Sequence, residues 1–150
     1  MGYNLEIGEL EIEFDTSDDR ESSLGLGVKI EKGRKELFLN VGEPTDGMNI
    51  RWPSYSSWRN FAEHAGLEEF FFDDSKGLIR QHPGTFPLCE DHRVIINQKY
   101  KDFKIKFPKS EANYNNPTKP ENGTLVRFEW LKYWINWALD NCEKPVFYNS

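Results

Sequence analysis

The sequence predicts an α+β fold, in which an N-terminal antiparallel β-sheet of three to five strands is packed on one face by three or four helices. A long aromatic-rich helix is expected near the C-terminal end. Three observations predict this class: apolar and polar residues alternate in the first 41 residues, apolar residues recur every three or four positions later, and the length suits one core. We therefore expect a single domain over residues 1–150.

The N-terminal region predicts the strands of the sheet. Its apolar positions change parity across Gly8-Glu9, which is the signature of a bulge or a tight turn. Further strands are expected over 24–31 and 36–41, separated by a turn that contains Gly33, a residue suited to positive φ. The first 41 residues are thus expected to form an antiparallel meander.

The first helices follow this meander. Ser54 is a suitable N-cap for a helix that runs to about Ala65, and Gly66 supplies its C-terminal stop. A short second helix is expected within "LEEFFFDD", residues 67–74. The first of these helices carries apolar residues three or four positions apart on its core face, namely Trp58, Phe61, Ala62 and Ala65.

A third helix is expected after Pro87, over about residues 88–102. A strand over "RVIIN", residues 93–97, is the less favoured alternative. The helix would place one stripe on a single face: Leu88, His92, Ile95 and Lys99. The alternation of Phe103, Ile105 and Phe107 with lysines predicts a short strand added to the sheet.

The C-terminal helix is expected from Thr124, as N-cap, to about Asn141. One apolar stripe comprises Leu125, Phe128, Leu131, Ile135, Leu139 and Cys142, and a second comprises Val126, Trp130, Tyr133 and Trp137. The sequence leaves open whether the second stripe is internal or forms a homo-oligomer interface through Trp130, Tyr133 and Trp137. The tail "KPVFYNS" is expected to pack back onto the domain.

Charge and composition exclude several classes of protein. The net charge is −6, but the first 23 residues hold eight acidic residues and one arginine, so the remainder is close to neutral. This layout favours contacts through local patches over bulk attraction for nucleic acid, so no nucleic-acid partner is expected. With neither a signal peptide nor a membrane span in the sequence, and with only Cys89 and Cys142, a cytoplasmic protein with reduced cysteines is expected.

No motif of an established catalytic or cofactor site occurs in the sequence, and we expect no cofactor. Cys89 and His92 lie three residues apart at a helix start, a spacing that places a cysteine nucleophile and its base on one face. A capped helix start with one cysteine explains the same residues and is the favoured interpretation. His82, Cys89 and His92 match no closed zinc spacing, and Asp73–Gly77 lacks the length of a calcium loop. No metal site is predicted.

Two segments suggest a ligand. The stretch "KYKDFKIKFPK", which includes Lys104 and Lys106, combines lysines with aromatic residues as nucleotide-binding surfaces do, although lysines also line solvent-facing strands. The loops between sheet and helices collect arginine and aromatic side chains suited to a planar anion. This second candidate site comprises Arg51, Trp52, Arg80, His82 and Phe86.

These observations predict a non-enzymatic binding protein that recognises a protein partner or a small anionic, nucleotide-like ligand through charged and aromatic patches. The alternative hypothesis is a small hydrolase or transferase acting on a phosphorylated or nucleotide substrate. In that case His82 would be the general acid or base and Arg80 would hold charge. The size and the lack of motifs are compatible with an accessory protein of a virus or mobile element.

Overall fold

The computed structural model describes residues 1–15, 23–29, 47–112 and 119–150. It confirms the α+β class: an antiparallel sheet and four described helices. The strand predicted over 36–41 lies outside the described residues, as does the turn at Gly33. The strand predicted over 24–31 is described as far as Lys29.

The sheet draws its strands from both ends of the chain. Its order is β2-β1-β5-β4, with β3 also paired to β1, and all pairs are antiparallel. The strands are β1 (Leu5–Asp15), β2 (Ser23–Lys29), β3 (Ile50–Arg51), β4 (Gly84–Pro87) and β5 (Pro145–Asn149). The expected packing of the tail onto the domain is therefore confirmed, and the tail does so as an inner strand.

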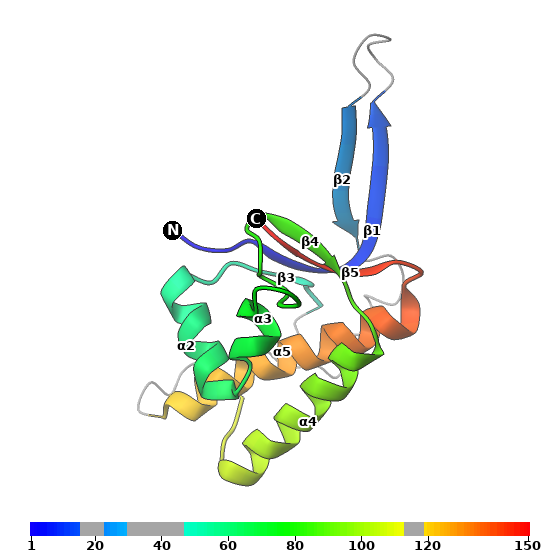
Figure 1. Cartoon of the computed structure of the whole chain (residues 1–150). Coiled ribbons are helices and arrows are strands. Elements are labelled where there is room, and N and C mark those ends of the chain that lie inside the picture. Colours follow the sequence, from blue (N-terminus) through cyan, green and yellow to red (C-terminus); the bar gives the residue numbers. More distant parts are fainter. Residues whose placement is uncertain (16–22, 30–46, 113–118) are drawn as a thin grey trace.

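The bulge expected at Gly8-Glu9 is absent from β1, which runs without interruption through these residues. The physical reason is a change of partner. The first half of β1 pairs with β5 as far as Glu9, and from Glu9 onward β1 pairs with β2 in continuous register. Figure 1 shows that the β1–β2 pair extends away from the helices, so the two halves of β1 have different surroundings.

Helices α2 (Tyr55–Ala65) and α3 (Glu68–Phe72) confirm the predicted boundaries. The Ser54 hydroxyl accepts the Ser57 N–H at 3.2 Å, which caps the start of α2. Gly66 ends the helix with φ of 73°, a left-handed conformation that glycine adopts without steric cost. The four predicted core residues of α2 are buried.

Helix α4 (Glu90–Lys106) is longer than predicted at its C-terminal end. The strand predicted over 103–107 does not form, because α4 continues to Lys106, and Phe103 and Phe107 pack four residues apart with ring centroids at 4.9 Å. The buried residues of α4 are Ile96 and Phe103. Of the stripe expected on one face, Leu88 precedes α4 and is buried, whereas Ile95 and Lys99 are exposed.

Helix α5 (Pro120–Asn141) begins one turn before the expected Thr124. Pro120 occupies the first turn, where proline costs no hydrogen bond, and Thr124 is a buried interior residue whose hydroxyl lies 2.7 Å from His64 Nδ1. Both predicted apolar stripes contribute to the core, because Leu125 and Val126 are buried together.

The helices lie on one side of the sheet, as Figure 1 shows. Between the two layers is a core rich in aromatic residues, in which Phe147 of β5 and Phe71 of α3 have ring centroids 5.7 Å apart. The largest fully buried side chains include Trp58, Trp130, Trp134, Phe71, Phe128 and Phe147. This packing of helices against β3 and β5 positions the site described next.

Candidate functional site

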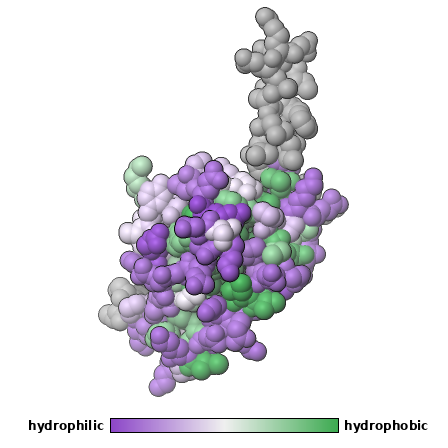
Figure 2. Space-filling view, in the orientation of Figure 1, coloured by the Kyte–Doolittle hydropathy of each residue, from purple (hydrophilic) through white to green (hydrophobic). Residues whose placement is uncertain are grey.

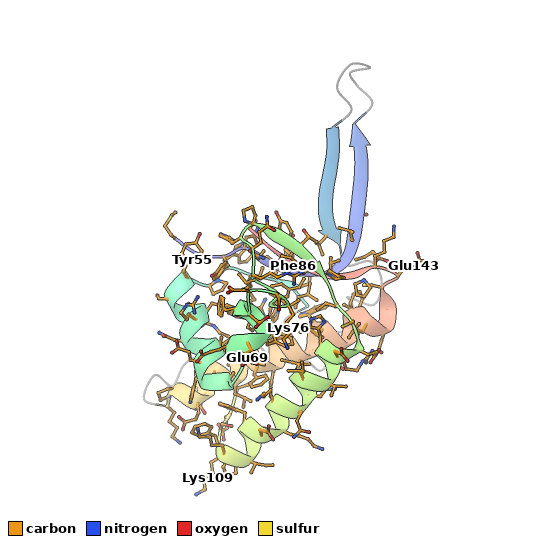
Figure 3. All side chains as sticks on the ribbon, in the orientation of Figure 1. Tyr55, Glu69, Lys76, Phe86, Lys109 and Glu143 are labelled. Atoms are coloured by element: carbon orange, nitrogen blue, oxygen red, sulfur yellow. The ribbon has the colours of Figure 1, made fainter. Side chains whose placement is uncertain are left out.

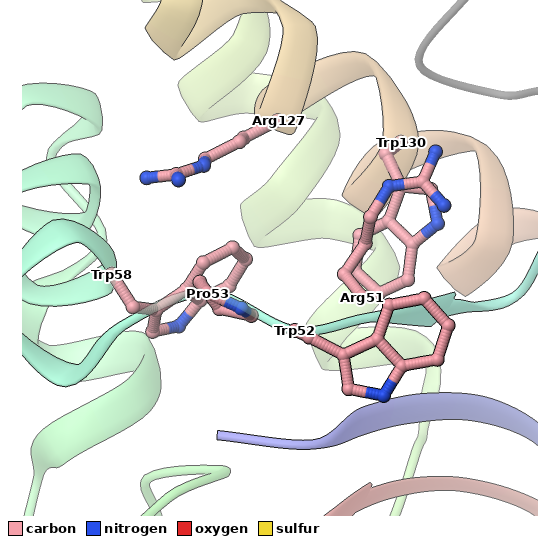
Figure 4. Close-up of a pocket in the computed structure, with 6 residues that line it drawn as sticks. All are labelled: Arg51, Trp52, Pro53, Trp58, Arg127 and Trp130. Carbon is pink, nitrogen blue, oxygen red and sulfur yellow. The ribbon is translucent and has the colours of Figure 1, made fainter. Parts of the chain in front are cut away.

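A small pocket of about 150 Å³ lies where the segment after β3 meets α2 and α5. Figure 4 shows its walls, which are made of two arginines, three tryptophans and a proline. The lining residues are Arg51, Trp52, Pro53, Trp58, Arg127 and Trp130. We call this site the arginine–tryptophan pocket.

The floor of the pocket is held by the N-terminal segment. Arg51 pairs with Leu5 across β3 and β1, and the Pro53 carbonyl accepts the Tyr3 N–H at 2.9 Å. Trp52 lies between these two backbone contacts and is itself 64% exposed. The pocket therefore has a floor joined to the N-terminal segment by hydrogen bonds, and an indole ring open to solvent at its rim.

Each arginine of the pocket faces an indole ring. The Arg51 guanidinium carbon lies 5.3 Å from the Trp130 ring centroid, and that of Arg127 lies 6.0 Å from the Trp58 ring centroid. Figure 4 shows the four side chains. The faces of indole rings attract cations, so both guanidiniums are oriented by these contacts.

Backbone carbonyls hold the same arginines further. Arg51 Nη1 donates to the Ile50 carbonyl at 2.8 Å, and Arg127 Nη1 donates to the Ser57 carbonyl at 2.9 Å. Within the part of the chain that the structure describes, no carboxylate pairs with Arg127, which is half-buried. A half-buried guanidinium with only neutral partners favours an anion nearby, since an anion adds charge-assisted hydrogen bonds.

Trp130 is an internal wall of this pocket. Its side chain is fully buried, and its Nε1 donates to the Met48 carbonyl at 2.9 Å. The expected oligomer interface therefore does not include Trp130. The other two residues named for that interface, Tyr133 and Trp137, are half-buried and pack against Trp134, which is fully buried.

The five residues predicted to form one loop site do not line a common pocket. Arg51 and Trp52 belong to the arginine–tryptophan pocket, whereas Arg80 lines a separate groove, and neither lining includes His82 or Phe86. The Arg80 guanidinium stacks on Phe86, with its central carbon 3.9 Å from the ring centroid, and its Nη1 donates to the Gly77 carbonyl. Phe86 itself is buried. The predicted set is therefore divided between the arginine–tryptophan pocket, which holds Arg51 and Trp52, and the contact of Arg80 with Phe86.

His82 is held by hydrogen bonds on both ring nitrogens. Its Nδ1 lies 2.6 Å from Asn149 Oδ1, and its Nε2 lies 3.2 Å from the Tyr55 hydroxyl. The Asn149 amide nitrogen donates to backbone carbonyls, including that of Gln81, which assigns Oδ1 as the acceptor toward His82. Nδ1 therefore carries the proton, and Nε2 accepts from Tyr55 when the ring is neutral. The Tyr3 ring packs edge-on against the rings of Tyr55 and His82.

A larger groove of about 1050 Å³ lies between α3, the loop after it and the first half of α4. We call it the α4 groove. Glu69 and Lys76, both labelled in Figure 3, are among the residues that line it. Its apolar lining comprises Phe70, Leu78, Pro87, Val94 and Ile95, and its basic lining comprises Lys76, Arg80 and Lys99.

The loop wall of the α4 groove is shaped by Asp73. Its Oδ2 accepts the Ser75 N–H at 3.1 Å, the Ser75 hydroxyl at 2.8 Å and the Lys76 N–H at 3.0 Å. These hydrogen bonds lower the pKa of Asp73, the Ser75 hydroxyl most of all. The segment Asp73–Gly77 is therefore a turn closed by its own carboxylate.

Cys89 and His92 meet at the start of α4. The Cys89 N–H donates to His92 Nδ1 at 3.0 Å, and the Cys89 sulfur lies 3.4 Å from the same nitrogen. This is the reciprocal arrangement of a capping box, which satisfies backbone groups at a helix start. Among the described residues, no three His, Cys, Asp or Glu side chains are close enough to hold a metal ion.

Lys104 and Lys106 lie in the last turn of α4. The Lys104 ammonium donates to the Ser110 carbonyl at 3.1 Å, and that of Lys106 lies 5.5 Å from the Phe107 ring centroid. Both charges suit the negative end of the helix dipole. Neither lysine lines the arginine–tryptophan pocket or the α4 groove.

Sequence reasoning found two residues of the arginine–tryptophan pocket and missed four. The sequence predicts Trp58 as a core residue and Trp130 as an interface residue, and no pattern points to Pro53. Arg127 had a visible signal, since it interrupts the most apolar stretch of the chain. A charged side chain in an apolar stretch has to extend either to solvent or into a pocket, and the Arg127 side chain extends into the arginine–tryptophan pocket.

The class that this fold defines is α+β, with a layer of helices on an antiparallel sheet. No family model, curated protein or solved structure matches the chain. Among the helices that the structure describes, none combines the length and the apolar character needed to cross a bilayer.

Proposed function

We propose that this protein is a non-enzymatic binding protein that takes a small anionic, nucleotide-like ligand at the arginine–tryptophan pocket. The observation that carries the proposal is the pair of guanidiniums, each facing an indole, beside the exposed ring of Trp52. A phosphate or carboxylate group would accept hydrogen bonds from the arginines. A planar group attached to it would stack on Trp52.

The size of the pocket supports a binding mode in which only part of the ligand enters it. A volume of about 150 Å³ is small beside the 300–1000 Å³ of most ligand pockets, so the interior suits only the charged group. The rest of the ligand would lie along the rim, where Trp52 is 64% exposed. A single phosphate attached to an aromatic base fits this division.

The chemistry of the lining supports binding over catalysis. Its side chains are arginine, tryptophan and proline, none of which serves as a general base or a nucleophile at neutral pH. A bound anion would be held and oriented there, and no side chain of this lining would attack it.

The test is calorimetric titration of the purified protein with adenosine monophosphate, adenosine and inorganic phosphate. We expect the monophosphate to bind more tightly than either part alone. Arg127→Gln should weaken monophosphate binding by roughly 10- to 100-fold, which corresponds to the loss of charge-assisted hydrogen bonds. Trp52→Ala should weaken monophosphate binding but leave the affinity for phosphate unchanged.

Arg59→Gln is the matched control for the arginine variant. Arg59 is exposed on α2 and stacks on Phe72 with its guanidinium carbon 4.1 Å from the ring centroid, outside the pocket. Its replacement removes the same charge from the protein and should leave binding unchanged. Equal losses in the Arg59 and Arg127 variants would contradict the proposal, as would the absence of heat with any of the three compounds.

The alternative, a small hydrolase or transferase, keeps one supporting observation. His82 is oriented by Asn149 at Nδ1 and offers Nε2 toward the Tyr55 hydroxyl, which is the arrangement that an acid–base histidine requires. Arg80, expected to hold charge, is engaged with Phe86 and Gly77 instead. Mass spectrometry after incubation with nucleotides separates the two functions. If the wild type forms a product and His82→Ala does not, the protein is an enzyme and the binding proposal is wrong.

A further inference from the structure

A stripe along α4 faces the α4 groove and has no covering element among the described residues. It carries Ile95 and Lys99, which the helical spacing predicts on one face, and the half-buried His92, which packs against Phe70. Val94 is 65% exposed and Ile95 is 40% exposed, and Figure 2 shows apolar residues interrupting the hydrophilic surface over α4. Adjacent branched apolar residues left in water on a helix are typical of an interaction surface.

The charges of α4 are divided between its two ends. Glu90 and Asp91 lie in the first turn, and Arg93, which follows them, is paired with Glu90 and with Asp140. The second half holds Lys99, Lys101, Lys104 and Lys106, with Asp102 as its only acid. An antiparallel neighbour with the same sequence would place its basic half beside the acidic first turn of α4, and its acidic first turn beside the basic half. The helix is therefore electrostatically complementary to a second copy of itself.

We propose that α4 pairs antiparallel with α4 of a second copy, around a two-fold axis at Ile95. In this register Ile95 meets Ile95 of the second copy, and Asp91 lies opposite Lys99 of the second copy, four residues on either side of the axis. A two-fold interface is self-complementary, so each such pair occurs twice. Neither Asp91 nor Lys99 has an ion-pair partner within the described residues, so both charges are available.

The arrangement of the groove supports this occupant. Val94 and Ile95 supply apolar contacts next to the axis, and Asp91 and Lys99 lie within the same lining at either end of the stripe. Packed helices approach to about 8–10 Å, which brings facing side chains into direct contact. The proposal concerns α4 and is independent of ligand binding at the arginine–tryptophan pocket.

Cross-linking tests the register. In a Cys89→Ser, Cys142→Ser background, Ile95→Cys should form a covalent dimer under mild oxidation, because a residue on the axis meets its own copy. Ile105→Cys is the matched control: Ile105 is 78% exposed on the same helix, but ten residues from the axis. At 1.5 Å per residue the two copies of residue 105 would be about 30 Å apart, too far for a disulfide.

Charge reversal tests the complementarity. Sedimentation velocity over a range of protein concentrations should show dimer formation, weakened roughly tenfold in Asp91→Lys and in Lys99→Asp, because each reversal creates two like-charge pairs. The double reversal should restore dimerisation. Lys144→Asp changes the net charge as Lys99→Asp does, but at an exposed site between α5 and β5, and should have little effect.

Three results would overturn the proposal. The first is a monomer at every concentration, which would leave the groove for another kind of partner. The second is cross-linking of Ile105→Cys as rapid as that of Ile95→Cys. The third is a double reversal that dimerises no better than the single reversals.

Discussion

At the scale of single residues, His92 shows how local packing changes a titratable group. Burial lowers the pKa of His92; the Asp91 carboxylate opposes this effect and the Arg80 guanidinium adds to it. The ring also packs edge-on against Phe70, with centroids 5.6 Å apart. Because Nδ1 accepts the Cys89 N–H, the neutral ring is the form that caps α4.

The lowered pKa of His92 predicts a pH dependence of stability. Since the unfolded chain binds a proton at His92 more readily than the folded protein does, the free energy of unfolding should fall as the pH drops below about 6.5. In His92→Gln, where the side chain still accepts the cap hydrogen bond but does not titrate, this decrease should be smaller. Urea denaturation at pH 7.5 and pH 5.5 measures the free energy of unfolding of both proteins. The same pH dependence in the variant as in the wild type would contradict this role of His92.

Whether a residue of the arginine–tryptophan pocket could be predicted depends on the kind of element in which it lies. Arg51 and Trp52 lie in a connecting segment, where exposed arginine and tryptophan are informative. Arg127 and Trp130 lie in a helix whose apolar pattern hides them, because a tryptophan in such a pattern is usually a core residue. Only the crossing of α5 with the segment after β3 turns that helix face into a pocket wall.

At the scale of elements, α4 carries the main correction. Phe103, Ile105 and Phe107 alternate with lysines, which indicates a strand, yet Phe103 and Phe107 also have the i, i+4 spacing of a helix. The two interpretations differ at Ile105, which a strand would bury beside Phe103. In the helix Phe103 is 4% exposed and Ile105 is 78% exposed. Packing of Phe103 against Phe128 of α5, with centroids 5.7 Å apart, favours the helix.

Alanine substitutions distinguish these two arrangements. Phe103→Ala should lower the free energy of unfolding by about 3–5 kcal/mol, because it leaves a cavity in the core. Ile105→Ala should change it by no more than about 0.5 kcal/mol, as is usual for exposed positions. Urea denaturation of both variants provides the measurement. Losses of similar size would favour the strand.

At the scale of the whole molecule, the two ends of the chain are joined in one sheet. The Asn4 N–H donates to the Ser150 carbonyl at 2.8 Å, and the Ser150 N–H donates to the Asn4 carbonyl at 3.0 Å. Strand β5 lies between β1 and β4, and Phe147 is fully buried. Glu9 adds a further link, since its carboxylate accepts the backbone N–H groups of Glu143 and Lys144.

Removal of residues 145–150 should therefore abolish cooperative unfolding, although these residues form only the tail of the chain. Without β5, strands β1 and β4 lose their shared partner, and the core loses Val146 and Phe147. Circular dichroism during thermal unfolding measures the cooperativity. Phe147→Ala in the full-length chain should give a weaker effect in the same direction, and a truncated protein with an unchanged transition would be inconsistent with an inner strand.

The α+β class, the boundaries of α2 and α3, and the aromatic character of the core follow from the amino-acid sequence alone. Periodicity, caps and composition are local properties, and local propensity agrees with the final fold in these places. The pairing of the strands, the buried face of α4 and the arginines that share a pocket are set by long-range packing. Those features depend on contacts between residues far apart in the chain, such as Arg51 with Trp130, and no local pattern encodes them.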